Sequence, residues 1–216
     1  MPKLSPATQA KRRSHILDAA ELCFARAGFH RTSMQDICRE AGVSAGAFYV
    51  YFASKEDLIS GIAERDRNKL AGELAELAKS PDLGTALARL GEHYAVEEPQ
   101  HKRLLCVEIG LEATRNEAVG KIYRSVDRFV LESFEQLFAR AAAEGRIKPD
   151  LTPEMLARIV IVLGDGMFWR RAVDPDFDIK SVIPIITAIV TGLLNPQESV
   201  EKAAIGAAEK VNGVQS

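Results

Sequence analysis

The sequence has little cysteine: it holds only Cys23, Cys38 and Cys106. Their number is odd, they are widely spaced and none forms a CxxC pair, so they provide neither a disulfide framework nor a zinc site. We expect all three to be buried small hydrophobic residues in a reducing compartment. A redox-sensing thiol stays open as the alternative, because the lowered thiol pKa that it needs is not visible in a sequence.

Long hydrophobic runs are also absent. The best candidate, SVIPIITAIVTGLL, is shorter than a bilayer-spanning helix and contains Pro184. The first residues, MPKLSPATQAKRRSH, are basic, but no apolar segment follows them as it would in a signal peptide. These absences predict a cytoplasmic protein without a membrane partner.

Catalytic and metal-binding patterns are missing as well. The four histidines have no metal-ligand spacing, and no nucleophile motif or pair of carboxylates stands out. We therefore expect no enzyme activity, no metal and no cofactor, and keep an all-helical enzyme as an alternative. The histidines are His15, His30, His93 and His101.

What the chain does have is the composition of a globular protein, with 216 residues of which 47% are hydrophobic and 27% charged. The net charge of −2 argues against nonspecific nucleic-acid binding, but the charges are unevenly distributed. Up to residue 31 only Asp18 and Glu21 are acidic. A surface that faces a polyanion and a solvated basic tail both explain this. The basic residues there are Lys3, Lys11, Arg12, Arg13, Arg26 and Arg31.

Apolar residues recur at spacings of three and four along almost the whole chain, and no segment alternates like a strand. This pattern predicts an all-α protein. Ser44 and Ser54 are expected N-caps, Gly28 is an expected C-cap, and Thr32 or Ser33 caps the second helix. The expected helices cover residues 10–27, 34–41, 45–52, 55–79, 83–97, 100–114, 117–144, 153–172 and 179–194, with a weakly predicted helix after Pro196.

The second and third helices, joined by a turn containing Gly42, predict a helix-turn-helix over about residues 33–52. The second helix of such a pair lies in the major groove and presents its first residues to base edges. The small residues Ala45, Gly46 and Ala47 would let the backbone come close to DNA. An aromatic-rich helix pair in an ordinary bundle is the alternative.

The aromatic residues of the third helix divide into two sets. Phe48 and Phe52, at i and i+4, suit a buried face. Tyr49 and Tyr51 can hydrogen-bond phosphates, and Val50 can touch a thymine methyl group. At the start of the fourth helix, Lys55 can join the backbone N–H groups there to hold a phosphate.

The stretch AAELCFARAGFHRTSMQDICREAGVSAGAFYVYFASKEDLISGI resembles the N-terminal DNA-binding domain of the TetR family of transcriptional regulators. The matching features are the Phe and Gly that end the first helix, TSMQDI, AGVS.G..Y.YF and SKEDL. The resemblance covers about residues 10–65 without a gap. It implies a three-helix DNA-binding domain over residues 10–70, a larger helical ligand-binding and dimerisation domain over 71–195, and a tail over 196–216.

The resemblance also assigns roles to matching positions. It implies backbone contacts from Thr32 and Ser33, and phosphate contacts from Tyr49, Tyr51 and Lys55. The positions that usually contact bases carry no hydrogen-bonding side chain here, so neighbours, Val50 or DNA shape must read the sequence. An N-terminal arm of Lys11, Arg12 and Arg13 would contact the backbone or minor groove. The expected DNA-binding residues are Thr32, Ser33, Ser44, Ala45, Gly46, Ala47, Tyr49, Val50, Tyr51 and Lys55.

For the C-terminal part, the resemblance implies an effector pocket and a homodimer interface. The apolar helices 153–172 and 179–194 agree with an interface, and a fully internal core is the alternative. The stretch VEIGLEATRNEAVGKIY loosely resembles the BetI-like branch. For Glu108, Glu112 and Arg115, a solvated salt-bridged face is the alternative to lining the pocket. For Trp169, the alternative is a core position. The candidates are Glu108, Glu112, Arg115, Asp165, Met167 and Trp169.

These expectations combine into a homodimeric repressor that binds a palindromic DNA operator and is released by an unknown small-molecule effector. The long fourth helix, which starts at Lys55, would be the hinge. A nucleoid-type or activating DNA binder without an effector is the alternative from a second class.

Overall fold

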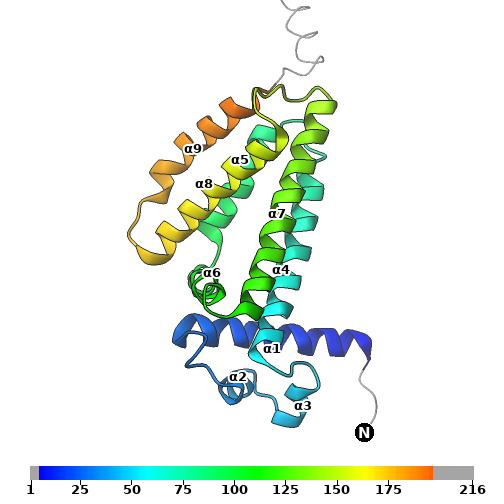
Figure 1. Cartoon of the computed structure of the whole chain (residues 1–216), viewed down its shortest axis with the longest axis vertical. Helices are drawn as coiled ribbons and strands as arrows, with labels where there is room; N and C mark the ends of the chain where they lie inside the picture. Colours follow the sequence, from blue (N-terminus) through cyan, green and yellow to red (C-terminus); the bar gives the residue numbers. More distant parts are fainter. Residues whose placement is uncertain (1–4, 197–216) are drawn as a thin grey trace, which may run out of the picture. The chain divides into compact units, whose positions relative to one another are not determined.

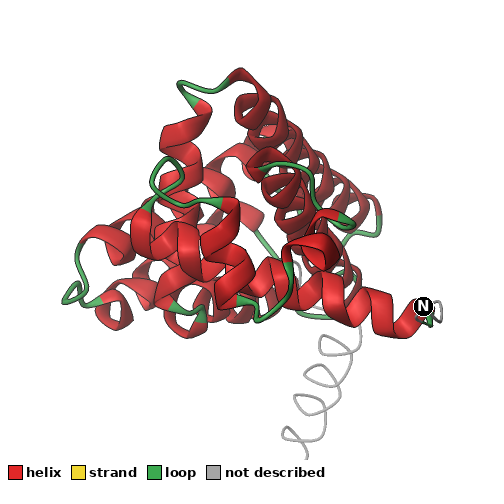
Figure 2. Cartoon of the chain, turned by 90° about the horizontal axis from the view of Figure 1, so that it is seen from below, coloured by secondary structure: helices red, strands yellow, loops and turns green. Residues whose placement is uncertain are grey.

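A computed structural model describes residues 5–196, and every regular element in that range is a helix (Figure 2). This confirms the predicted all-α class. Among the described residues, none of the helices is long and apolar enough to cross a membrane. The elements are α1 (Pro6–Ala27), α2 (Met34–Glu40), α3 (Ala45–Tyr49), α4 (Lys55–Leu77), α5 (Leu83–Glu92), the π-helical turn η1 (His93–Glu97), α6 (Gln100–Ala113), α7 (Glu117–Ala143), α8 (Pro153–Val173) and α9 (Ile179–Leu194).

Three helix boundaries differ from the prediction by three residues or more. Helix α1 begins at Pro6 because Ser5 caps it, accepting the Thr8 N–H at 3.2 Å, and proline is tolerated in a first turn. Helix α3 ends at Tyr49, three residues early. The helix expected to end at Glu97 stops earlier and continues as η1. The helix predicted after Pro196 lies outside the described residues.

The chain divides into two compact units, which we describe separately. Among the described residues, the first combines 5–70 with 97–130 and 168–177, and the second combines 71–96, 131–167 and 178–196. One boundary between the units lies within α4, after Leu70, and the expected division into two continuous domains stays a prediction. The first unit is not one continuous stretch, however, because α6 and the first half of α7 join helices α1 to α3.

In the first unit, α1 is the central helix and packs against α2 and α6 (Figure 1). Its apolar side, including Ile16, Leu17 and Phe24, is at most 1% exposed. Gly61 of α4 lets that helix approach closely, since a Cβ there would lie 3.0 Å from the Leu17 side chain. Burial of this core holds the small helices α2 and α3 in place.

In the second unit, α5 packs against α9. On α7 the rings of Phe134 and Phe138 stack with their centroids 6.0 Å apart, and Phe138 is fully buried. Leu194 at the end of α9 is fully buried as well. Outside this core, aliphatic side chains of α8 and α9 are exposed.

The cysteine expectation is confirmed in two of three places. Cys23 and Cys38 are buried, and burial raises the pKa of both thiols. Cys106 is exposed, which corrects the expectation for that residue.

Candidate nucleic-acid interface

Local hydrogen bonds define the helix-turn-helix. Ser33 caps α2 in a reciprocal capping box: its hydroxyl oxygen accepts the Asp36 N–H at 3.1 Å, and the Asp36 carboxylate accepts the Ser33 N–H at 3.0 Å. Gly42 takes a left-handed φ of 62° in the turn, and Ser44 then caps α3 by accepting the Ala47 N–H. Ser33 is thus the cap that the sequence left open between two residues, and Ser44 is confirmed as a cap.

Helix α4 is also capped by side-chain hydrogen bonds at its start. The Ser54 hydroxyl accepts the Asp57 N–H at 3.1 Å, and the Asp57 carboxylate accepts the Ala53 N–H at 3.0 Å. The chain therefore turns sharply between α3 and α4.

Two phenylalanines anchor α3 to the rest of the first unit. Phe48 is fully buried and Phe52 is 3% exposed, with their ring centroids 6.4 Å apart. The Arg13 guanidinium of α1 lies 5.4 Å from the Phe52 ring centroid. The buried assignment of these two residues is confirmed. A helix of five residues has little stability of its own, so this anchoring is what fixes its orientation.

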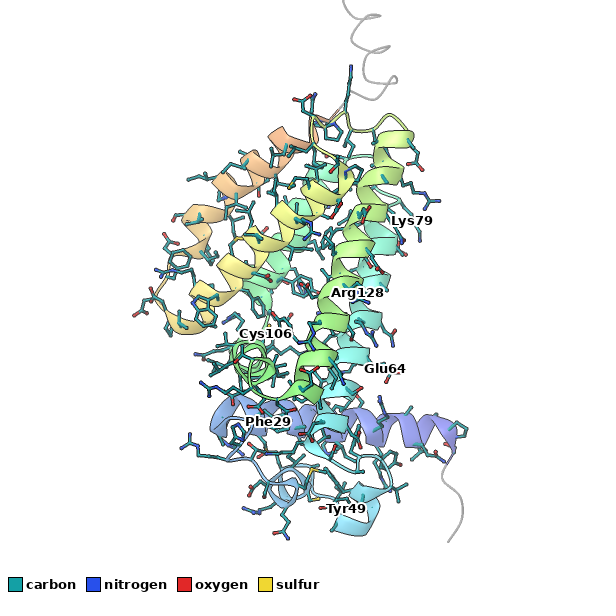
Figure 3. The ribbon with its side chains drawn as sticks, in the orientation of Figure 1. Phe29, Tyr49, Glu64, Lys79, Cys106 and Arg128 are labelled. Atoms are coloured by element: carbon teal, nitrogen blue, oxygen red, sulfur yellow. The ribbon has the colours of Figure 1, made fainter. Side chains whose placement is uncertain are left out.

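The opposite face of α3 is open to solvent. Tyr49 is 52% exposed and Val50 is 79% exposed, and Ala45 and Gly46 are exposed beside them. Figure 3 labels Tyr49 on α3. Among the other predicted contact residues, Ser33 and Ser44 are exposed, and Ala47 and Tyr51 are half-buried.

Two predicted contact residues are turned inward. Thr32 is 2% exposed, and its hydroxyl donates to the Cys23 and Gly28 carbonyls at 3.1 and 2.8 Å. Its side chain is not available to a phosphate, which corrects that expectation. The half-buried Lys55 ammonium donates to the Phe29 carbonyl at 2.5 Å and lies 4.3 Å from the Phe29 ring centroid. Because an ammonium has three donors, a phosphate contact by Lys55 stays a prediction.

Around this surface, charged side chains are mostly paired. Hydrogen bonds from Ser33 lower the pKa of Asp36, whose carboxylate also accepts from Arg39 at 2.9 Å. In the expected N-terminal arm, Arg13 pairs with Glu64 at 2.8 Å, whereas Lys11 is exposed. A hollow of about 500 Å³ between α1 and α2 is lined by Cys23, Arg26, Ala27, Thr32, Asp36, Arg39 and Glu40.

Two pocket candidates on α6 contact the turn that follows α1. The Glu108 carboxylate accepts the Phe29 N–H at 2.6 Å, and Glu112, 4% exposed, lies 2.8 Å from the His30 imidazole. The alternative of a solvated salt-bridged face therefore fails for Glu112. Arg115 follows the end of α6 at Ala113 and is exposed, so it does not share the helical face expected for it.

The remaining pocket candidates lie on α8. Asp165 is exposed, Met167 is half-buried, and Trp169 is 53% exposed. The exposure of Trp169 removes the alternative of a core tryptophan. That these residues line an effector pocket stays a prediction.

A buried charge cluster in the first unit escaped the sequence analysis. Glu21 of α1 is 2% exposed and lies 2.5 Å from the Arg65 guanidinium of α4 and 3.5 Å from the Lys102 ammonium of α6. Burial lowers the pKa of Lys102, but Asp66, Glu21 and Glu98 outweigh it and leave that pKa raised. The sequence signal that could have revealed this cluster was Glu21, an acidic residue spaced among the buried apolar positions of α1. These ion pairs hold α1 against α4 and α6, and so help to position the open face of α3.

An all-helical fold with a capped α2–turn–α3 pair, in which one face of α3 is buried and the other is open, defines a helix-turn-helix DNA-binding protein. A family model described as bacterial regulatory proteins, tetR family, matches residues 16–62. The HTH-type transcriptional regulator UidR of Escherichia coli (strain K12) is 32% identical over 162 residues, which are 72% of this chain and 79% of UidR. The chain belongs to the TetR family of transcriptional regulators.

Further comparisons agree with this assignment. The HTH-type transcriptional repressor AcnR of Corynebacterium diphtheriae is 27% identical, over 82% of this chain and 90% of AcnR. The structure of Salmonella enterica GusR is 31% identical, covers 85% of this chain and 95% of GusR, and has a TM-score of 0.73. The expected likeness to the BetI-type branch is not supported, since the similar proteins include UidR and AcnR.

Proposed function

We propose that this chain is a homodimeric transcriptional repressor that binds a palindromic DNA operator and is released by a small-molecule effector. The observation that carries the proposal is the division of α3 into the buried Phe48 and the exposed Tyr49 and Val50. Such a helix is held rigidly from one side and can enter a major groove with the other. Because its proposed partner is DNA, we place its action in the cytoplasm.

Exposed apolar side chains of the second unit support dimerisation. Met155 and Val162 of α8 are 48% and 68% exposed, and Ile185 and Ile189 of α9 are 62% and 49% exposed. Spacings of seven and four place each pair on one side of its helix. Single exposed aliphatic residues are ordinary, but matched stripes on two helices indicate a surface that a partner covers. We infer that the partner is a second copy of this chain.

A two-fold dimer sets the form of the operator. Two recognition helices related by a two-fold axis read two half-sites in opposite directions, about 34–36 Å or a multiple of it apart. This geometry favours an inverted repeat over a single asymmetric site.

Release by an effector requires that α6 or α4 respond to it. Glu108 ties α6 to the Phe29 backbone, and the Asn116 amide donates to the Glu56 carboxylate at 3.1 Å near the start of α4. We propose that an effector that prefers a second position of α6 weakens operator binding through these contacts, with α4 as the hinge.

Selection of genomic fragments with the purified protein tests the proposal. We expect enrichment of one inverted repeat, and the genes beside it to be the regulated ones. A nucleoid-type binder would instead bind all fragments alike, with a steep salt dependence. Without any enriched inverted repeat, the repressor proposal fails. A thermal-shift screen of metabolites, followed by operator release with each stabilising compound, tests the effector.

A further inference from the structure

The exposed face of the recognition helix is made almost wholly of carbon. Val50 is 79% exposed and Tyr49 52% exposed, and Ala45 and Gly46 complete the open face. Helix α3 therefore presents no amide, carboxylate or guanidinium group to DNA. The side chains that usually distinguish bases by paired hydrogen bonds, such as arginine with guanine or asparagine with adenine, are missing there.

The hydroxyl groups near this face cannot supply the missing discrimination. The Ser44 oxygen is held at the helix cap by the Ala47 N–H, which leaves one O–H to donate. Each base pair offers at least one acceptor in the major groove, so a single hydroxyl accepts several bases. The Tyr49 hydroxyl has the same limitation, and both groups suit phosphate oxygens.

Helix α2 does not supply the discrimination between bases either. The first helix of a helix-turn-helix crosses the DNA backbone, so the exposed Gln35 of α2 is placed toward phosphates. The Arg39 guanidinium is bound to the Asp36 carboxylate at 2.9 Å. Direct readout is therefore left to the apolar surface of α3.

We propose that this chain reads its operator through the C5-methyl groups of thymines, with Val50 as the specificity-determining side chain. The thymine methyl is the apolar group in the major groove; its place differs between T·A and A·T pairs, and it is absent from G·C and C·G pairs. An isopropyl group that is open to solvent and fixed at the C-cap of an anchored helix is a matching surface for it. This inference rests on the proposed function and adds the chemistry by which the operator is recognised.

The first experiment selects binding sites from two random DNA libraries, one containing thymine and one containing deoxyuracil, which lacks only the methyl group. We expect the thymine library to yield the tighter consensus, with a conserved thymine in each half-site. Burying one methyl group corresponds to about fourfold in affinity, or roughly sixteenfold over both half-sites. Equally tight consensus sites from both libraries would overturn the methyl inference and leave the repressor proposal standing. If neither library yields a consensus, both the methyl inference and the repressor proposal are overturned.

The second experiment assigns the contact to Val50. We expect Val50→Ala and the equally shaped Val50→Thr to discriminate less between thymine and deoxyuracil operators, because the first lacks both γ-methyl groups of valine and the second replaces one of them with a hydroxyl. Val50→Ile should keep the preference for thymine. Val173→Thr, at another exposed valine, is the matched control and should discriminate like the original chain. If Val50→Ala and Val50→Thr keep the full preference, Val50 is not the reader and the inference fails.

Discussion

Two surfaces of this molecule expose apolar side chains, and they are built differently. On α3 the open face combines Val50 and Tyr49 with residues that have almost no side chain, Ala45 and Gly46. On α8 and α9 the open sides carry large aliphatic groups such as Val162, Ile185, Ile189 and Met155. The two surfaces therefore differ in bulk more than in polarity.

This difference in bulk follows from the partner that we propose for each surface. A backbone that approaches base edges has to keep its side chains short, and the polar contacts go to the phosphates. A surface that meets a second copy gains stability from the aliphatic area that it buries. Exposed carbon alone does not define an interface, but the size of the exposed groups indicates what kind of partner fits.

The largest effect is expected when the aliphatic surface of the second unit is charged. In the variant Val162→Asp/Ile185→Asp, burial of two carboxylates in each subunit should prevent dimerisation. The mass by light scattering should fall to that of one chain, 23.6 kDa. Operator affinity should fall by about 10²–10⁴-fold, because the second half-site is no longer bound within the same complex.

The matched control is Lys180→Glu, a charge change at another exposed position of α9. It should remain a dimer and bind the operator normally. A dimer of the double variant with unchanged operator affinity would show that α8 and α9 do not form the interface.

The next largest effect is expected at Phe48, which supports the open face of α3 from behind. Phe48→Ala should lower the free energy of unfolding of the first unit by about 3–5 kcal/mol, because the ring is fully buried. Phe48→Leu should cost less. Denaturant unfolding measures both, and hydrogen exchange should localise the loss to α3. A loss below about 1 kcal/mol for Phe48→Ala would contradict the anchoring role.

How much of this arrangement the sequence predicts is clearest at α3. The i, i+4 spacing of Phe48 and Phe52 predicted the buried face, and serine at position 44 predicted the start of the helix. Both signals are local. The end at Tyr49 was missed: the chain turns there toward α4, where the Asp57 carboxylate of the next helix binds the Ala53 N–H.

Residues whose roles depend on distant partners could not be assigned from sequence. Thr32 looked like an exposed cap, but its hydroxyl bonds to carbonyls at the end of α1. Lys55 and Glu108 both bind the Phe29 backbone, from positions 26 and 79 residues away in the chain. No periodicity shows such contacts, because they depend on how the helices pack.

A smaller effect is expected for the phosphate contact of Tyr49. Tyr49→Phe removes one hydroxyl from a side chain that is 52% exposed, so stability should not change. Affinity should fall by about 1 kcal/mol per half-site, and equally for operator and unrelated DNA. Tyr123→Phe, at an exposed tyrosine of α7, is the control and should leave binding unchanged. A loss confined to the operator would mean that Tyr49 reads bases.

The smallest effect, and the sharpest test of close approach, comes from two glycines. A Cβ added at Gly46 of α3 or at Gly72 of α4 would have nothing within 4 Å, and neither residue has a positive φ. Both Gly→Ala variants should therefore stabilise the free protein, by about 0.4–1 kcal/mol in thermal or denaturant unfolding. Only Gly46→Ala should weaken operator binding, because its new methyl group would meet the bases. If Gly46→Ala binds the operator as tightly as Gly72→Ala does, the helix does not sit deep in the groove, and the small residues of α3 need another explanation.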